Sequence, residues 1–252
     1  MDNLFPVETL FVVAFFAFLL GGTVKGAIGI GLPTTVVSVL SQVTDPRTAI
    51  ALGLMSMIIS NIWQMVRQGE VAATVRRFWP IALTTAVVMY LTSIQAADIP
   101  FDLILMLTGV AIAIFAAASL IGEPPELAEK WEKPGQVVAG VICGAMGGLT
   151  GIWSPPMLVF LLARRLQKDE FVRAMGFLLF TGSAPLLLGY TQTGLMTDRL
   201  FIASCLFLIP TFAGYWLGEK LRGRMDGARF QKAVLWAFLI MGLNLVRRGL
   251  TG

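Results

Sequence analysis

Long apolar runs without a charged residue dominate this sequence, and they restrict the chain to folds that are stable inside a lipid bilayer. The runs that qualify are 48–66, 78–97, 103–121, 174–197 and 200–218. A helix of about 20 residues, rising about 1.5 Å per residue, crosses the hydrocarbon core of a bilayer. Within lipid, backbone groups are satisfied only inside helices or closed barrels, and these runs are continuous rather than alternating. We therefore predict an all-α polytopic membrane protein.

The residue types that are scarce or missing exclude most kinds of membrane chemistry. Only 13% of the 252 residues are charged, against about a quarter in soluble domains. The chain has no histidine, which is the commonest metal ligand and proton shuttle, and no apolar run contains Asp or Glu. We therefore expect no metal, no cofactor and no enzyme active site. The net charge of +4 is too small to predict a nucleic-acid partner.

A glycine-rich motif occurs once in each half of the chain. Five residues of the first copy match the second at one constant offset: Gly22, Gly26, Gly29, Ile30 and Pro33 fall opposite Gly144, Gly148, Gly151, Ile152 and Pro155. Each copy is followed by a short apolar piece, a charged turn and a long apolar helix. We predict a first repeat at 1–121, a polar linker at 122–134 and a second repeat at 135–252.

Each repeat is predicted to contain five helical segments. They lie near 8–24, 33–43, 48–66, 78–97 and 103–121 in the first repeat, and near 135–150, 155–163, 174–197, 200–218 and 230–246 in the second. The second segment of each repeat is too short to span, since about ten residues cover only about 15 Å. Breaks before these short segments are assigned to Gly26, Pro33, Gly148, Pro155 and Pro156. Short, Gly/Pro-interrupted segments at matching places in two halves point to a transport site.

Basic residues suggest how the chain is oriented, because Lys and Arg concentrate in cytoplasmic loops. They cluster at 67–77, 164–173 and 220–232. If the first two segments of each repeat form a hairpin that enters and leaves on one face, all three clusters share that face and the repeats are inverted. If those segments form one broken span, two clusters fall outside. We favour the hairpins, although Arg247 and Arg248 would then lie outside.

Three stretches resemble the repeated signature of the TauE/SafE sulfite exporter family. They are GTVKGAIGIGLP at 22–33, DPRTAIAL at 45–52 and GAMGGLTGIWSPP at 144–156, and the resemblance covers nearly the whole chain. It implies a multi-pass protein of the plasma membrane (the inner membrane of a bacterium) that exports sulfite, sulfoacetate or a related organosulfonate. Family members often carry a Gly-Gly-Gly-Pro type of second motif. Trp153 and Ser154 stand at two of those places here, which puts the substrate in doubt.

The starts of the two short helices are the predicted anion site. A helix N-terminus offers free N–H groups and about half a positive charge. The residues that would line these starts are Gly29, Gly31, Thr34 and Thr35 in the first repeat, and Thr150, Gly151 and Ser154 in the second. We expect one anion at the membrane midplane between the two N-termini. Alternatively, the glycines serve only close helix packing.

Lys25 is the only charged residue between Glu8 and Asp45, and a charge inside a membrane is a functional hypothesis by default. It binds an anion or exchanges a proton, or it lies near the end of its helix and extends to the interface. Four other polar residues in apolar runs are further candidates for the pocket or for helix–helix hydrogen bonds: Asn61, Gln64, Thr181 and Ser183.

The function predicted from these observations is export of a small sulfur-containing anion. An anion channel and a non-transport membrane assembly protein are the alternatives. The expected partners are the anion and the lipid bilayer, with a homodimer as one possible state. Because the spans lack Asp, Glu and His, we expect transport without an obligatory sodium or proton site.

Overall fold

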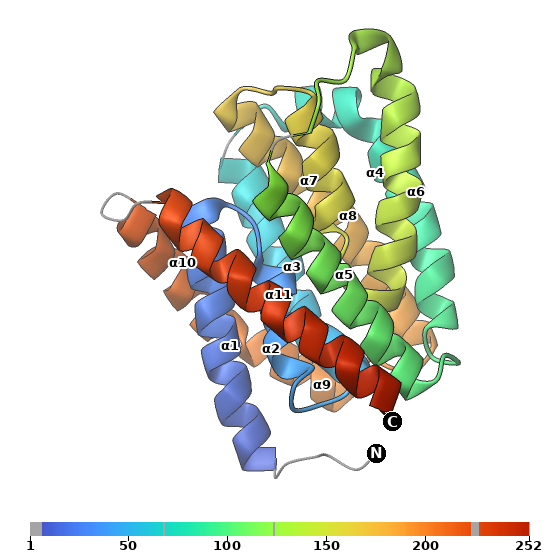
Figure 1. Ribbon diagram of the computed structural model, residues 1–252, viewed down its shortest axis with the longest axis vertical. Helices are drawn as coiled ribbons and strands as arrows, with labels where there is room; N and C mark the ends of the chain where they lie inside the picture. Colours follow the sequence, from blue (N-terminus) through green and yellow to red (C-terminus); the bar gives the residue numbers. More distant parts are fainter. Residues whose placement is uncertain (1–6, 68, 123, 223–226, 252) are drawn as a thin grey trace.

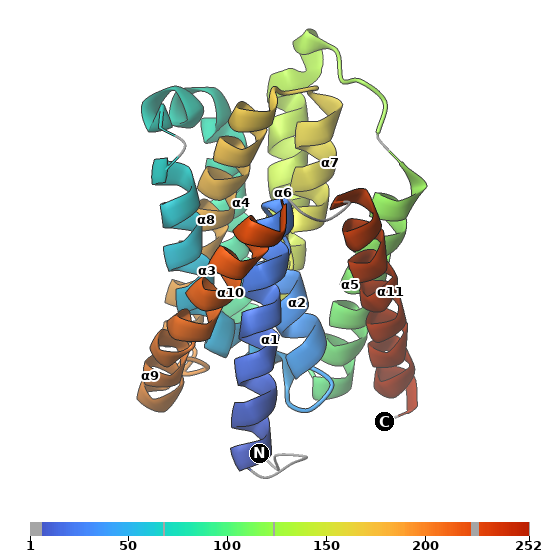
Figure 2. The same ribbon diagram turned by 90° about the vertical axis from the view of Figure 1, so that its left-hand side faces the viewer.

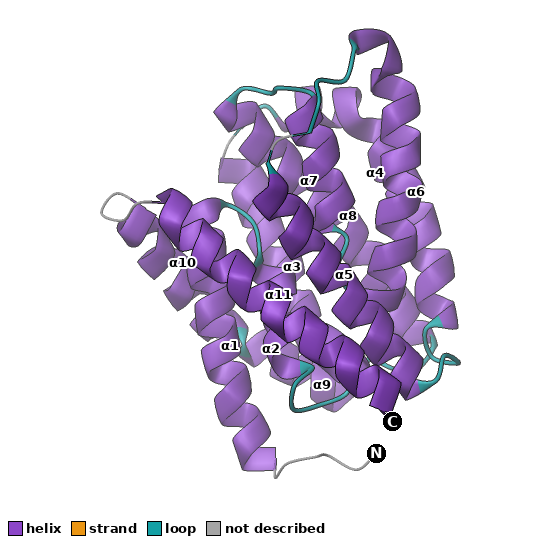
Figure 3. Ribbon diagram, viewed as in Figure 1, coloured by secondary structure: helices purple, strands orange, loops and turns teal. Residues whose placement is uncertain are grey.

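The computed structural model describes residues 7–67, 69–122, 124–222 and 227–251, and all regular structure among them is helical (Figure 3). The predicted all-α class is therefore confirmed. Seven segments are long and apolar enough to cross a membrane within the described ranges. Many large apolar side chains point outward, including Ile209, Trp216 and Ile240. Such a surface suits lipid rather than water.

The helices follow the predicted segments closely. The first half contains α1 (Val7–Ile28), α2 (Leu32–Leu40), α3 (Pro46–Arg67), α4 (Val71–Gln95) and α5 (Phe101–Ile121). A short 3-10 turn at Glu129–Trp131 closes the linker. The second half contains α6 (Glu132–Thr150), α7 (Ser154–Ala163), α8 (Lys168–Gln192), α9 (Asp198–Leu206), α10 (Leu208–Arg222) and α11 (Gly227–Thr251).

Two predicted spans differ in shape because of proline. The segment expected at 200–218 is divided into α9 and α10 at Phe207, since Pro210 has no N–H for the carbonyl four residues earlier. The segment expected to begin at 78 begins at Val71 instead and is kinked at Phe78, whose backbone angles are φ −106° and ψ 16°. Pro80 follows two residues later and accounts for that kink.

Most helix pairs join one half of the chain to the other. In Figure 1, α1 packs against α10 on the left, α4 against α6 on the right and α5 against α11 in front, with α3 and α8 in contact behind them. Figure 2 shows the same pairs from the side. The long helices therefore do not form two separate domains, because each half completes the other.

Glycine allows the backbones of these pairs to approach closely. A Cβ at Gly22 or Gly26 of α1 would collide with backbone atoms of α10. A Cβ at Gly144 or Gly148 of α6 would collide with α4. Small residues are the usual means of packing helices in lipid, where the hydrophobic effect does not drive them together. The glycines that match between the two copies of the motif therefore have matched packing roles.

The two short helices belong to hairpins that open at opposite ends of the bundle. In Figure 1, the start of α1 and the end of α2 lie at the lower end, whereas the start of α6 and the end of α7 lie at the upper end. The basic segments 67–77 and 164–173 also lie at the upper end, and Arg67 pairs with Glu219 at the end of α10 at 2.7 Å. We call this end the basic end.

The arginines near the C-terminus lie at the other end, but Arg248 has a local structural role there. Its Nη1 donates to the carbonyl oxygens of Ser41 and Gln42 at 3.0 and 2.9 Å. These carbonyls lie at the C-terminal end of α2, where the helix dipole is negative. Because Arg248 caps the end of α2, its position is weak evidence about which end of the bundle faces the cytoplasm.

Candidate functional site

Lys25 lies inside the bundle, near the end of α1. Its side chain is 1% exposed, and its Nζ donates to Ser60 Oγ at 3.0 Å and to Asn61 Oδ1, both on α3. Among the described residues it is the only charged residue that is buried, and it forms no ion pair with any described carboxylate. Lys25 therefore does not extend to the membrane interface in this structure.

Two buried polar atoms without a partner lie on the part of α3 that Lys25 contacts. Asn61 Oδ1 accepts the hydrogen bond from Lys25, and Asn61 Nδ2 is buried without a partner. One turn further along α3, Gln64 Nε2 donates to the Val172 carbonyl at 2.9 Å, while its Oε1 is buried without a partner. Buried polar atoms without a hydrogen bond are uncommon and indicate a site that a ligand or water completes.

The first break joins α1 to α2 through Gly29 and Gly31. Both have positive φ, 94° and 104°, which only glycine adopts without strain. Pro33 occupies the first turn of α2, where a missing N–H costs nothing. Thr35 Oγ1 donates to the Gly31 carbonyl at 2.7 Å, and Thr34 Oγ1 is buried and unpaired.

The second break follows the same pattern with different side chains. Gly151 has φ 69°, Thr150 Oγ1 donates to the Met146 carbonyl at 2.7 Å, and Ser154 Oγ is buried and unpaired. Pro155 and Pro156 lie in the first turn of α7. Because two consecutive prolines remove two N–H groups, this N-terminus is a poorer hydrogen-bond donor than expected.

Two of the residues predicted as breaks are not breaks. Gly26 lies within α1 and Gly148 within α6, and both face a neighbouring helix at close range. The chain leaves the helix only at residues 29–31 and 151–153. Glycine inside a membrane helix is tolerated, so its presence did not mark the end of the helix.

Lys25 and the second break contact α3 at different heights. A Cβ on Gly151 would collide with Ile50, whereas Lys25 bonds Ser60. Ten residues of helix separate these contacts, or about 15 Å. The predicted anion between both N-termini stays a prediction, and Leu158, one turn into α7, lines one small pocket of about 20 Å³ together with Gly31 of the first break.

The remaining candidates on α8 do not join Lys25. Thr181 Oγ1 donates to the Leu178 carbonyl at 2.9 Å, and Ser183 Oγ to the Leu179 carbonyl at 2.7 Å. Between them, Gly182 faces the indole of Trp153. Both hydroxyls are thus satisfied within their own helix, beside the second break.

Trp153 fills the space at the second break. Its side chain is fully buried and is the largest such side chain among the described residues. A Cβ on Gly182 would lie 2.7 Å from its Nε1, and that nitrogen has no hydrogen-bond partner. The tryptophan that departs from the family motif therefore acts as a plug between α6 and α8.

The first break instead forms the floor of a cavity of about 380 Å³. Its walls come from the end of α5, from α7 and from the start of α8, and Ile28 and Ile30 line it from below. A separate pocket of about 20 Å³ lies next to it and is lined by Val24 and Gly31. The cavity was not predicted from the sequence, because its apolar lining residues look like ordinary lipid contacts.

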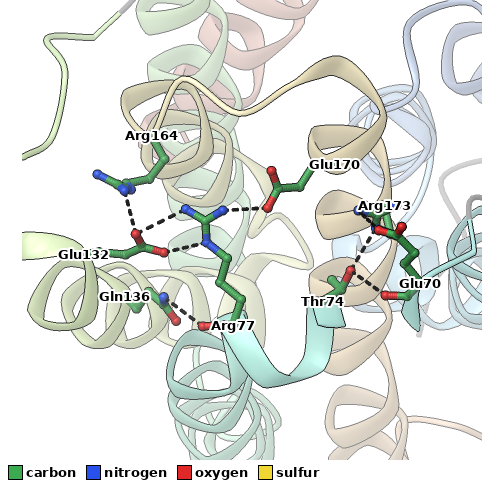
Figure 4. Close-up of polar contacts among 8 residues, drawn as sticks. All are labelled: Glu70, Thr74, Arg77, Glu132, Gln136, Arg164, Glu170 and Arg173. Atoms are coloured by element: carbon green, nitrogen blue, oxygen red, sulfur yellow. Dashed lines mark hydrogen bonds and ion pairs between the residues drawn. The ribbon is translucent and has the colours of Figure 1, made fainter. Parts of the chain in front are cut away.

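A network of ion pairs at the basic end was also missed (Figure 4). Arg77 on α4 pairs with Glu132 on α6 at 2.8 Å and with Glu170 on α8 at 2.6 Å. Arg164 pairs with Glu132 at 2.6 Å, and Arg173 pairs with Glu70 at 3.0 Å. These loops contain acidic residues beside the basic ones, and that pattern could have predicted the ion pairs.

This network has a definite electrostatic effect on Glu132. Burial raises the pKa of Glu132, but hydrogen bonds and charge from Arg77 and Arg164 outweigh burial, so the pKa lies below its ordinary value of 4.5. Gln136 Nε2 also donates to the Arg77 carbonyl at 3.1 Å, just before the kink of α4. The network therefore attaches the first two turns of α4 to both α6 and α8.

Comparison with known proteins adds the family. The sequence model of the family described as Sulfite exporter TauE/SafE matches residues 14–245. No curated protein and no solved structure gives a significant match. That family consists of integral membrane transporters of the exporter type, not enzymes. The match spans nearly the whole chain. Seven helices within the described ranges are long and apolar enough to cross a membrane, as a multi-pass protein requires. This protein therefore belongs to the TauE/SafE family of membrane exporters.

Proposed function

We propose that this protein exports a small sulfur-containing anion and that Lys25 is the cation that binds it. The observation that carries the proposal is the burial of an ammonium group that donates hydrogen bonds to Ser60 and Asn61, which are both neutral. A buried charge without a counter-ion is unfavourable. An anion beside Lys25 would supply the missing charge.

Nearby groups support an anion at this position. The unpaired Asn61 Nδ2 is a hydrogen-bond donor, and the N-terminus of α2 begins after Gly31, whose added Cβ would meet Val24, the neighbour of Lys25. A helix N-terminus carries about half a positive charge. This proposal centres the anion at the first break, beside Lys25, and the N-terminus of α7 as a second contact stays a prediction.

The same proposal includes an orientation. We place the basic end in the cytoplasm, following the preference of Arg and Lys for cytoplasmic loops, and treat the halves as inverted repeats. Two observations support the inversion: the hairpins open at opposite ends, and exchanging the halves leaves the helix pairing unchanged, with α1–α10 corresponding to α6–α4.

The membrane potential is sufficient to drive export. An inside-negative potential contributes about 2.3 kcal/mol per charge per 100 mV, which is about fiftyfold accumulation outside for a monovalent anion. We expect flux in proteoliposomes to respond to an imposed potassium diffusion potential with no sodium or pH gradient. Flux that stays at background until such a gradient is added would contradict this mechanism.

Binding is tested with thermal stability, because a ligand that binds only the native state raises its stability. We expect sulfite or an organosulfonate, but not phosphate or a simple carboxylate, to raise the melting temperature of the purified protein. Lys25→Met should lose this shift, whereas Lys220→Met should keep it, because Lys220 is exposed over the Trp216 ring. No shift with any sulfur-containing anion would argue against the proposal.

A further inference from the structure

Three buried hydroxyl groups on α2 have no hydrogen-bond partner. They belong to Thr34, Ser38 and Ser41, whose side chains are 0% exposed. A serine or threonine inside a helix normally donates to the carbonyl three or four residues earlier, as Ser183 and Thr191 do in α8 at 2.7 and 2.8 Å. Because buried polar groups are nearly always paired, the three exceptions on one short helix need an explanation.

The three hydroxyls share one face of α2. Their spacing of four and then three residues places them above one another along the helix. Leu32 and Val36 lie on the opposite face and belong to an apolar cluster with residues of α1. The hydroxyl face therefore points away from α1, and α2 also contacts α3, α5 and α11 (Figure 1). On α5, Thr108 adds a fourth fully buried hydroxyl without a partner.

This hydroxyl face leads away from the first break. Thr34 comes three residues after Gly31, and Ser41 follows the last residue of α2. At about 1.5 Å per residue, the face is about 10 Å long. It extends toward the end of the bundle opposite the basic end (Figure 1). The proposed orientation places that end outside the cell.

Guanidinium groups lie where the hydroxyl face ends. The C-terminus of a helix carries about half a negative charge, which would repel an anion. Arg248 Nη1 donates to the carbonyls of Ser41 and Gln42 at 3.0 and 2.9 Å. Arg47 donates to a carbonyl of the α4–α5 turn, and its Nε is buried without a partner. The carboxylate of this turn, Asp45, accepts from the Arg47 backbone N–H at 2.8 Å, so it caps α3.

We propose that the hydroxyl face of α2 is the outer half of the transport route, along which the anion passes from the first break to the guanidinium groups of Arg47 and Arg248. A hydroxyl without a partner can donate to a passing anion and replace part of its hydration shell, and arginine commonly lines anion pores. The face is fully buried here, so this conformation is closed on the outer side. This inference rests on the proposed function and adds the residues of the exit route.

The first experiment removes two hydroxyls that lie beyond the first break. Ser38→Ala/Ser41→Ala should lower the maximal flux of sulfite and methanesulfonate in proteoliposomes about tenfold or more, the scale of losing a hydrogen bond to a charged group. The melting-temperature shift produced by sulfite should remain, because the Lys25 site is intact. Removing an unpaired buried hydroxyl should not lower stability. Wild-type flux in the double variant would overturn the inference.

Ser93→Ala is the matched control for this variant. Ser93 is also 0% exposed, but its Oγ donates to the Tyr90 carbonyl within α4 at 2.8 Å. Its flux should equal that of wild type. An equal loss of flux in Ser93→Ala would show that any buried serine has this effect, and would remove the support for a route along α2.

The second experiment labels Ser38→Cys in a background without Cys143 and Cys205. A membrane-impermeant methanethiosulfonate added outside should modify this thiol and stop flux, because an outward-open state exposes the hydroxyl face. The sulfonate-bearing reagent should react several-fold faster than the trimethylammonium-bearing one, after correction for their rates with a free thiol. Ser93→Cys should stay unmodified. No modification of Ser38→Cys, or faster reaction with the cation, would overturn the inference.

The outcomes separate this inference from the proposed function. If wild-type protein neither binds nor transports sulfite or methanesulfonate, the proposed function fails, and the labelling, which needs no transported anion, still tests the route. If wild type and the double variant transport equally well, the route alone fails. Loss of the sulfite-induced melting-temperature shift in the double variant would place these hydroxyls in the binding site and contradict an exit role.

Discussion

Lys25 carries its charge into the helix bundle, where it donates hydrogen bonds to neutral oxygen atoms of Ser60 and Asn61. A lysine near the end of a membrane helix commonly extends its long side chain to the interface. Here the helix continues to Ile28, and the side chain turns inward to α3. The direction in which the side chain points, not its distance from the helix end, distinguishes a binding residue from an interfacial one.

Replacing this residue should weaken substrate affinity more than it changes the amount of folded protein. We expect Lys25→Met to raise the substrate concentration for half-maximal flux by about tenfold or more, on the scale of about 1.5–3 kcal/mol for a hydrogen bond to a charged group. Flux in proteoliposomes over a range of substrate concentrations is the measurement. Unchanged kinetics at normal protein yield would assign Lys25 a purely structural role.

Trp153 should contribute strongly to stability because it is the largest fully buried side chain described. Trp153→Ala leaves a cavity at the second break, and such substitutions cost about 3–5 kcal/mol in protein cores. We expect a clearly lower melting temperature in detergent. Trp216→Ala, which changes a side chain that is 59% exposed, should change it little, and equal losses in both variants would refute the plug role.

At the scale of elements, α4 shows how a helix can be attached at one end and bent in the middle. Arg77, Gln136 and Arg173 connect its first two turns to α6 and α8, while Phe78 and Pro80 interrupt its regular hydrogen bonding. The kinked portion is therefore held by side chains rather than by continuous helix. Because ion pairs form this attachment, its stability should depend on the charge of Glu132.

The attachment should weaken in acid. The pKa of folded Glu132 lies below its ordinary value of 4.5, so its ion pairs stabilise the protein fully above that value and are lost as the pH falls through the folded pKa. Melting temperatures of wild type and Glu132→Gln should differ at about pH 7 and converge as the pH falls below 4.5 and through the folded pKa of Glu132.

The exposed pair Arg67–Glu219 is the control for this effect. Its side chains are 51% and 31% exposed, and exposed pairs contribute little. Glu219→Gln should match wild type at both pH values. A difference between wild type and Glu132→Gln that does not depend on pH would show that shape, and not charge, matters at Glu132.

At the scale of the whole molecule, the two hairpins set which parts of the chain reach each side of the membrane. The turn at Asp45 follows α2, and Gln167 follows α7. In the inverted arrangement these two turns lie on opposite faces. The contact pattern of the helices supports that arrangement, and it is tested directly by labelling in intact cells.

We expect a membrane-impermeant thiol reagent to modify Asp45→Cys from outside and Gln167→Cys only after the cells are opened. The background should be a variant without Cys143 and Cys205, the two native cysteines. Transport by each variant serves as the check on folding. Modification of both positions from the same side would exclude the inverted arrangement.

Local signals in the sequence were enough to predict the helices and the presence of two breaks, whereas the division into two repeats stays a prediction. Apolar length indicates a span, proline indicates a helix start, and glycine with positive φ permits a sharp turn. These signals act between residues that are neighbours in the chain. The same local signals placed Gly26 and Gly148 at the breaks, because glycine also serves helix packing.

Only the tertiary structure decided what the polar residues do. Lys25 meets a partner 35 residues away, and Arg77 meets one 93 residues away. The contacts of Lys25 and of the second break with α3, and the cavity beside the first break, likewise depend on how helices from both halves pack. Apolar periodicity shows that a helix is buried without identifying its neighbour, because many apolar faces fit one another. The choice of neighbour comes from the close contacts of particular glycines and from ion pairs between distant residues.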